Sequence, residues 1–237
     1  MKRYLIGNLI VDIEADCERL NRLGKPYETD KDTPADISIN IPSEIIDDMQ
    51  IKYPTLTRDT LNYMATGTMF FRKVTVFDAI MLHSSCIMFE NKAYMFTADS
   101  GTGKSTHTAL WKQVFGDKVT YINDDKPLLR KINGVWTAFG NPWSGKTDLN
   151  TNCSAPVGGI VFLNRGKENT IKKLNPPIDS VASLFMDQTV KPRSARNATA
   201  MLVNADDLLM SVPLFELYCN VSEEAVWTAY NAIVKED

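Results

Sequence analysis

The stretch Tyr94–Thr106 limits the possible folds of this chain more than any other part of the sequence. It reads Tyr-Met-Phe-Thr-Ala-Asp-Ser-Gly-Thr-Gly-Lys-Ser-Thr, a short apolar run followed by a turn that ends in Gly-Lys-Ser. The backbone N–H groups of such a turn can surround a phosphate, and glycine permits both the tight turn and the close approach of the anion. A helix after the turn would direct its positive N-terminal end at the same phosphate. The sequence therefore predicts a strand over 93–98, a phosphate-binding loop and a helix over Thr106–Phe115.

Within this motif, particular side chains have particular predicted tasks. Lys104 is expected to reach the β- and γ-phosphates of a nucleotide, and the Ser105 hydroxyl to bind Mg²⁺. The full motif has a further glycine at the position of Ala98, whose small side chain fits there if its φ is negative. The alternative is a chance glycine-rich turn. The predicted nucleotide-binding residues are Asp99, Ser100, Gly101, Thr102, Gly103, Lys104, Ser105 and Thr106.

Composition excludes several classes of protein. The chain has 237 residues, 44% of them hydrophobic and 23% charged, which suits one large globular domain or a domain with a small extension. A net charge of −3 gives no basic footprint for nucleic acid, and four scattered cysteines without a CxxC pair argue against a metal cluster. Polar residues interrupt the N-terminal apolar run, so neither a signal peptide nor a membrane span is predicted. We expect a cytoplasmic protein with no membrane partner.

An acidic pair follows the predicted loop helix. A predicted strand over Lys118–Asn123 ends in Asp124 and Asp125. An apolar strand that ends in a carboxylate, downstream of a phosphate loop, is typical of Mg²⁺ sites in nucleotide-dependent enzymes, because the metal needs hard oxygen ligands. The second carboxylate could accept a proton from an attacking hydroxyl. The alternative is an acidic surface turn.

His83 lies just before a predicted strand, Ser85–Phe89, which is joined by a hairpin turn to the strand of the loop. A single histidine is more often structural than catalytic. Its place beside the loop strand makes it a candidate for the same site as the acidic pair.

Together these motifs resemble a known family. The series His83, then Asp99–Ser105, then Asn123-Asp124-Asp125 is similar to the catalytic domain of the HPr kinase/phosphorylase family, which is related to the ATP-binding core of phosphoenolpyruvate carboxykinases. The resemblance covers residues 75–235. It implies a mixed α/β fold with a phosphate loop, mixed β-sheets and flanking helices. It also implies a catalytic ATP-binding domain over 75–237 and a small α+β N-terminal extension over 1–74.

The resemblance also implies chemistry for these residues. ATP and Mg²⁺ would be the cofactors, with Ser105 and Asp125 holding the metal and Lys104 contacting the phosphates. Asp124, paired with His83, would orient and deprotonate a hydroxyl acceptor. Family members assemble into oligomers, so a homo-oligomer is a further expectation.

One family signature has no counterpart here. The Ile-Arg-Gly-type motif that supplies a Glu and an Arg after the acidic pair is absent, and the corresponding region is the turn-rich stretch 139–148. Lys146 in that stretch could supply a cation to the transferring phosphate, or could be a solvated lysine in a Pro/Gly hairpin. The acceptor is therefore expected to be a hydroxyl other than that of HPr, on a small molecule, a peptide or a protein.

Two other functions remain open from the sequence. One is a nucleotide-binding regulatory or assembly protein without transfer activity, which stays open because Ala98 stands where the motif has glycine and the family signature is missing. The other is a carboxykinase-like enzyme, against which the short chain argues.

Hydrophobic patterning predicts the remaining elements. The other predicted strands are Tyr4–Glu14, Ile37–Ile41, Val157–Leu163 and Asn169–Leu174. The other predicted helices are Glu44–Gln50 with Ser43 as its N-cap, Thr57–Thr66, a short helix or turn over Phe77–Leu82, Pro177–Met186, Ala195–Leu209 and a closing helix capped by Ser222.

Overall fold

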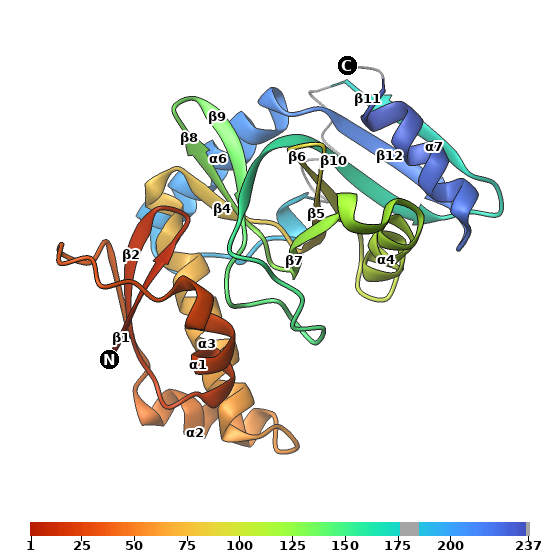
Figure 1. Cartoon of the computed structure of the whole chain (residues 1–237). Coiled ribbons are helices and arrows are strands. Elements are labelled where there is room, and N and C mark those ends of the chain that lie inside the picture. The colour runs from red at the N-terminus through yellow and green to blue at the C-terminus, as the bar shows by residue number, and fades with distance from the viewer. Residues whose placement is uncertain (176–184, 236–237) are drawn as a thin grey trace.

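The N-terminal part of the chain forms a three-stranded sheet with helices beside it in the computed structural model, which describes residues 1–175 and 185–235 (Figure 1). β1 and β2 form an antiparallel hairpin, and β3 pairs with β2 in parallel. The strands are β1 (Lys2–Ile6), β2 (Leu9–Glu14) and β3 (Ile37–Asn40), and the helices are α1 (Glu18–Gly24), α2 (Ser43–Lys52) and α3 (Arg58–Lys73).

Two predictions for this part are wrong in detail. The predicted strand Tyr4–Glu14 is two strands, because Gly7 and Asn8 both have positive φ, at 58° and 62°, as a two-residue hairpin turn requires. Ser43 is the first residue of α2 rather than its cap, since Pro42 occupies the N-cap position. By contrast, Thr57 caps α3, because its side chain accepts a hydrogen bond from the Thr60 amide.

The rest of the chain forms a mixed sheet. Its main path runs β4-β8-β9-β10-β6-β5-β7, and β12 joins β10 to β11. β10 is parallel to β6 and β12, whereas the other pairs are antiparallel. The strands are β4 (Ala79–Met81), β5 (Ser84–Phe89), β6 (Lys92–Thr97), β7 (Thr120–Asp125), β8 (Leu128–Ile132), β9 (Val135–Phe139), β10 (Ser154–Arg165), β11 (Thr170–Leu174) and β12 (Leu214–Cys219).

Helices cover both faces of this sheet. α4 (Lys104–Phe115) and α7 (Glu223–Ile233) pack on one face, where Trp111 of α4 lies in a hydrophobic cluster with Phe96. α6 (Ala195–Ser211) packs on the other face, where Leu208 lies in a cluster with Met95. Neighbouring residues of β6 thus point to opposite faces of the sheet, as the alternation of side chains along a strand requires. The mixed α/β architecture expected from the sequence is confirmed.

Most of the other predicted elements are found with shifted ends. Of the predicted short helix or turn over Phe77–Leu82, the structure has a turn at Asp78, which adopts a left-handed conformation, and the chain then continues as β4. The hairpin β8–β9, which turns at Asn133 and Gly134, was not predicted. Most of the predicted helix Pro177–Met186 lies outside the described residues. Ser222 caps α7 as expected, accepting a hydrogen bond from the Ala225 amide.

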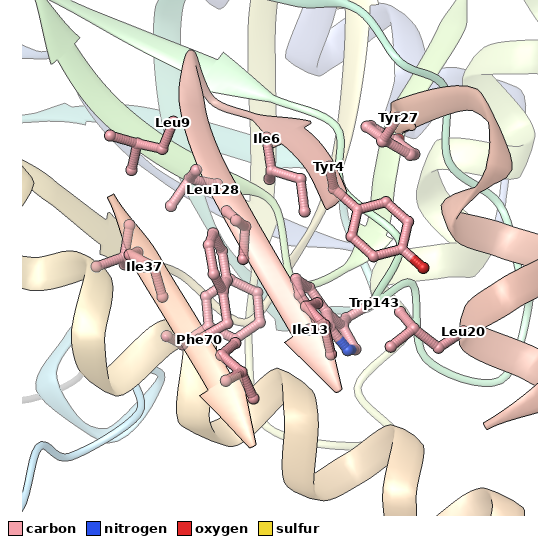
Figure 2. Close-up of a cluster of buried hydrophobic side chains, with 14 of the residues drawn as sticks. Tyr4, Ile6, Leu9, Ile13, Leu20, Tyr27, Ile37, Phe70, Leu128 and Trp143 are labelled. Atoms are coloured by element: carbon pink, nitrogen blue, oxygen red, sulfur yellow. The ribbon is translucent and has the colours of Figure 1, made fainter. Parts of the chain in front are cut away.

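The hydrophobic core of the N-terminal sheet includes residues from beyond residue 74. Figure 2 shows Leu128 and Trp143 among the side chains of this core, together with Tyr4, Ile13 and Phe70. The Trp143 ring stacks on Phe70 at 4.9 Å between centroids. Trp143 belongs to the segment between β9 and β10, so this core holds that segment against α3.

The contact between α3 and Trp143 leads to a prediction about Gly67. Replacing a helical Gly with Ala usually stabilises a helix by about 1 kcal/mol, but a Cβ at Gly67 would lie 2.7 Å from Cδ1 of Trp143. We expect Gly67→Ala to destabilise the protein by about 1–3 kcal/mol in urea unfolding, because the core becomes overpacked. In a Trp143→Phe background the same change should cost clearly less, and an equal cost in both backgrounds would contradict this explanation.

Candidate active site

The register of three strands brings the predicted site residues to one edge of the sheet. In β5, Ser84 is paired with Thr97 of β6 on one side and with Asp125 of β7 on the other. Because β5 is antiparallel to both neighbours, its first residues lie beside the last residues of β6 and β7. His83, the turn after β6 and the acidic pair at the end of β7 therefore meet at this edge.

The turn Asp99–Gly103, here called the glycine loop, joins β6 to α4. Gly101 and Gly103 have φ values of +80° and +122°, and no atom lies within 4 Å of where a Cβ would stand on either residue. Glycine is therefore required by the backbone conformation, and open space remains above the loop. Ala98 has no positive φ, which satisfies the condition set for an alanine at that position. The first turn of α4 directs its unpaired amides at the same space.

Lys104 lies across the glycine loop and is nearly buried. Its Nζ donates hydrogen bonds to the carbonyl oxygens of Ala98, at 2.8 Å, and Asp99, at 3.3 Å. Burial lowers the pKa of Lys104, while the charges of Asp125, Asp99 and Asp124 act in the opposite direction. The ammonium group is thus fixed at the loop by two carbonyl oxygens and attracted by the charges of three aspartates.

Asp124 is the most unusual side chain of the site. It is 3% exposed, and neither carboxylate oxygen has a hydrogen-bond partner among the described residues. A buried carboxylate without a partner costs free energy, since the protein does not replace the hydrogen bonds of water. An unsatisfied pair of hard oxygen atoms at this place is suited to a divalent cation.

Asp125 has the opposite environment. Its Oδ1 lies 3.1 Å from Nε2 of His83, and its Oδ2 contacts the ammonium group of Lys126. Burial alone would raise the pKa of Asp125, but His83 and Lys126 outweigh burial and lower it to about 2. Asp125 is therefore ionised and held in one position at neutral pH.

This geometry corrects the expected pairing of His83. We predicted that His83 pairs with Asp124, whereas the structure pairs it with Asp125. Because side chains alternate along β7 and its pairing with β5 is irregular between Cys86 and Ile87, the sequence does not determine which carboxylate faces the imidazole.

Gln188 is part of the site, although no sequence motif indicated it. Its Oε1 lies 3.2 Å from Nδ1 of His83, its backbone oxygen accepts a hydrogen bond from the His83 amide at 2.7 Å, and its Nε2 donates to Asp99 at 3.4 Å. A chain of contacts therefore runs from the glycine loop through Gln188 and His83 to Asp125.

Two hollows meet at the glycine loop. The main cleft, of about 690 Å³, lies between the loop and helices α1 and α3, and the outer hollow, of about 390 Å³, lies on the other side of the loop. Gly101, Gly103 and Thr106 line both. The predicted site residues that line the main cleft are His83, Ser100, Gly101, Gly103, Lys104, Ser105, Thr106, Asp124, Asp125 and Lys146. Asp99 and Thr102 do not line it.

Lys146 and Ser105 lie at the exposed wall of the main cleft. Lys146 makes no ion pair or hydrogen bond with a described residue, so its charge is available to a ligand. The opposite wall includes Arg19, Tyr63 and Met64 from α1 and α3, which the sequence did not indicate as site residues. The outer hollow has apolar walls from Leu110, Leu163 and Val221.

The oxygen atoms of this site suit a metal ion whose remaining ligands come from a nucleotide. In residues 1–175 and 185–235, no group of three or more His, Cys, Asp or Glu side chains could hold a metal ion by itself. Mg²⁺ is commonly bound by one or two carboxylates together with phosphate oxygens and waters. The Asp124 carboxylate has no hydrogen-bond partner among the described residues and lines the same cleft as Ser105 and the glycine loop, which fits that mode of binding. Within the described residues, every helix is too short or too polar to cross a lipid bilayer.

Comparisons with known proteins give little beyond this geometry. No protein-family model and no curated protein matches the sequence. Among solved structures, the chain is similar to the Hpr(Ser) kinase/phosphatase from Coxiella burnetii, with a TM-score of 0.31 and 11% sequence identity over 52% of this chain and 86% of that chain. A similarity of this size says nothing about the site residues, and the family resemblance expected from the motifs stays a prediction.

The two neighbouring carboxylates should respond oppositely to the same substitution. Asp124→Asn removes a buried carboxylate that has no hydrogen-bond partner and should stabilise the protein without nucleotide or metal by about 1–3 kcal/mol, because a neutral amide costs less to bury and this gain exceeds the lost attraction to Lys104. Asp125→Asn breaks the contacts with His83 and Lys126 and should destabilise it by a similar amount, about 1–3 kcal/mol. Urea unfolding at pH 7 measures both, and equal losses of stability would contradict this account of Asp124.

Asp125 should also make stability depend on pH. Its folded pKa of about 2 lies below the ordinary value of 3.8, so its contribution is present above pH 4 and is lost as the pH falls toward 2. Linkage gives about 2 kcal/mol at pH 5 and about half of that at pH 3. The difference in unfolding free energy between the wild type and Asp125→Asn should therefore narrow from pH 5 to pH 3, and a constant difference would refute the assignment.

Proposed function

We propose that this protein is an ATP- and Mg²⁺-dependent kinase that transfers the γ-phosphoryl group to a hydroxyl. The observation that carries the proposal is the buried, unpartnered Asp124 carboxylate, which faces the same cleft as the glycine loop and Lys104. In phosphoryl transfer the protein mainly positions the reactants and neutralises charge, and a carboxylate, a glycine loop and a lysine are groups that can do both.

The two hollows support a nucleotide as the donor. A triphosphate on the amides of the glycine loop would lie where both hollows meet. The base would then lie in the outer hollow, beside Leu110, Leu163 and Val221, and the γ-phosphate would reach the main cleft. Lys104 would exchange its contacts with Ala98 and Asp99 for phosphate oxygens.

Asp124 and Ser105 are the residues that would hold the metal. Asp125, expected as a ligand from the family resemblance, already has both oxygens engaged by His83 and Lys126, whereas those of Asp124 are free. When bound, Mg²⁺ would neutralise charge on the β- and γ-phosphates.

The His83–Asp125 pair supports a role at the acceptor. A carboxylate with a pKa near 2 is a weak base, but it can fix the direction of an acceptor hydroxyl and take its proton once the bond to phosphorus has largely formed. His83 and Gln188 hold Asp125 in place for that task. Lys146, exposed on the cleft wall, would contribute positive charge near the γ-phosphate.

Transfer of label from γ-labelled ATP tests the proposal. With Mg²⁺ and a panel of free serine, serine peptides and cell extract, we expect label on at least one acceptor. Lys104→Ala and Asp124→Asn should each lower the rate at least about 100-fold.

Lys112→Ala is the matched control, since Lys112 lies on the same helix but pairs with the exposed Asp117. Its activity should equal that of the wild type. Tight ATP binding without transfer to any acceptor would overturn the kinase and favour a nucleotide-binding regulatory protein.

A further inference from the structure

The segment between β9 and β10 shapes the main cleft although most of it has no regular secondary structure. It carries Lys146, and its Gly145 packs directly on Asp125: a Cβ on Gly145 would lie 2.6 Å from the Asp125 Cβ. Gly145 also has a φ of +65°, a conformation that residues with a side chain rarely adopt. A displacement of this segment would therefore move both Lys146 and the surroundings of Asp125.

Residues of α3 hold the first half of the segment. The Tyr63 hydroxyl accepts a hydrogen bond from the Ser144 amide at 2.9 Å and donates one to the Pro142 carbonyl at 3.0 Å. The Trp143 Nε1 donates to the Thr66 hydroxyl at 3.3 Å. The segment runs toward α1 and α3 in Figure 1, which agrees with these contacts.

Arg19 of α1 holds the second half. Its Nη2 donates to the Gly145 carbonyl and lies 2.5 Å from the Asp148 carboxylate, and its Nε donates to the same carboxylate at 3.1 Å. The guanidinium also lies over the Tyr63 ring, 4.2 Å from its centroid. A planar guanidinium can make these contacts at once, whereas a lysine cannot.

Arg22 provides a natural comparison in the same helix. It binds the other oxygen of Asp148 at 2.6 Å, but among the described contacts it has no hydrogen bond to Gly145 and does not lie over the Tyr63 ring. Its side chain is 62% exposed, compared with 22% for Arg19. The two arginines therefore share the ion pair and differ in the contact with the cleft segment.

We propose that Arg19 is a positioning residue that holds Gly145 and Lys146 against the Asp125 side of the cleft. This inference rests on the proposed function, which assigns the positioned groups their tasks at the acceptor and the γ-phosphate. Arg19 makes no described hydrogen bond or ion pair with the glycine loop. Its loss is therefore expected to slow transfer without weakening ATP binding.

Arg19→Met and Arg22→Met test the proposal in the full chain. Methionine keeps much of the apolar stem and removes the donors in both variants. We expect Arg19→Met to lower kcat for transfer about 10- to 100-fold with the Kd for ATP within twofold of the wild type. Arg19→Lys, which keeps the positive charge but not the planar guanidinium with its several N–H donors, should recover only part of kcat. Arg22→Met should leave kcat and the Kd for ATP within twofold of the wild type.

Hydrogen–deuterium exchange gives a measurement that does not depend on activity. Peptides covering 140–150 should exchange at least fivefold faster in Arg19→Met than in Arg22→Met, with peptides covering 99–106 unchanged. Equal exchange and equal kcat in the two variants would overturn the role of Arg19. A lower ATP affinity that accounts for the whole fall in the transfer rate of Arg19→Met would overturn it as well. If the wild type transfers no phosphoryl group, the proposed function fails, and the exchange comparison still decides whether Arg19 holds the segment.

Discussion

The pairing of β5 with both β6 and β7 is the constraint on which the whole site depends. Ser84 faces Thr97 and Asp125 in the two ladders, so the glycine loop, His83 and the acidic pair share one edge. A slip of one residue in either ladder would carry side chains to the opposite face of the sheet. The clusters around Phe96 and Met95, on the two faces of β6, resist such a slip.

The site assigns different environments to two adjacent aspartates. Asp125 is bound by His83 and Lys126, and Asp124 has no partner among the described residues. The first arrangement fixes a charge in place, whereas the second leaves a charge unsatisfied at a cost to folding. Functional sites commonly carry such a cost, which well-packed cores elsewhere in the fold offset. Two identical side chains at adjacent positions of β7 therefore have different surroundings, because successive side chains of a strand point to opposite faces.

Local features could be predicted from the sequence, and distant contacts could not. The glycine loop, its strand and the α4 helix depend on neighbouring residues, which is why their pattern indicates them. The hairpins at Gly7-Asn8 and Asn133-Gly134 are also local, because both pairs are residue types that adopt the positive φ of a two-residue turn. The contacts of Gln188 with His83, and of Arg19 with Gly145, join residues more than a hundred positions apart. No spacing rule connects such residues before the fold is known.

Trp143 gives the segment between β9 and β10 a second dependence on the N-terminal sheet. Its ring belongs to the core that Tyr4, Ile13 and Phe70 form, while the next residues reach Asp125. Loosening that core would therefore disturb the wall of the cleft that carries Gly145 and Lys146. The same core includes Ala79, Met81, Leu128 and Phe139 of the large sheet, so both sheets and the cleft wall depend on one set of packed side chains.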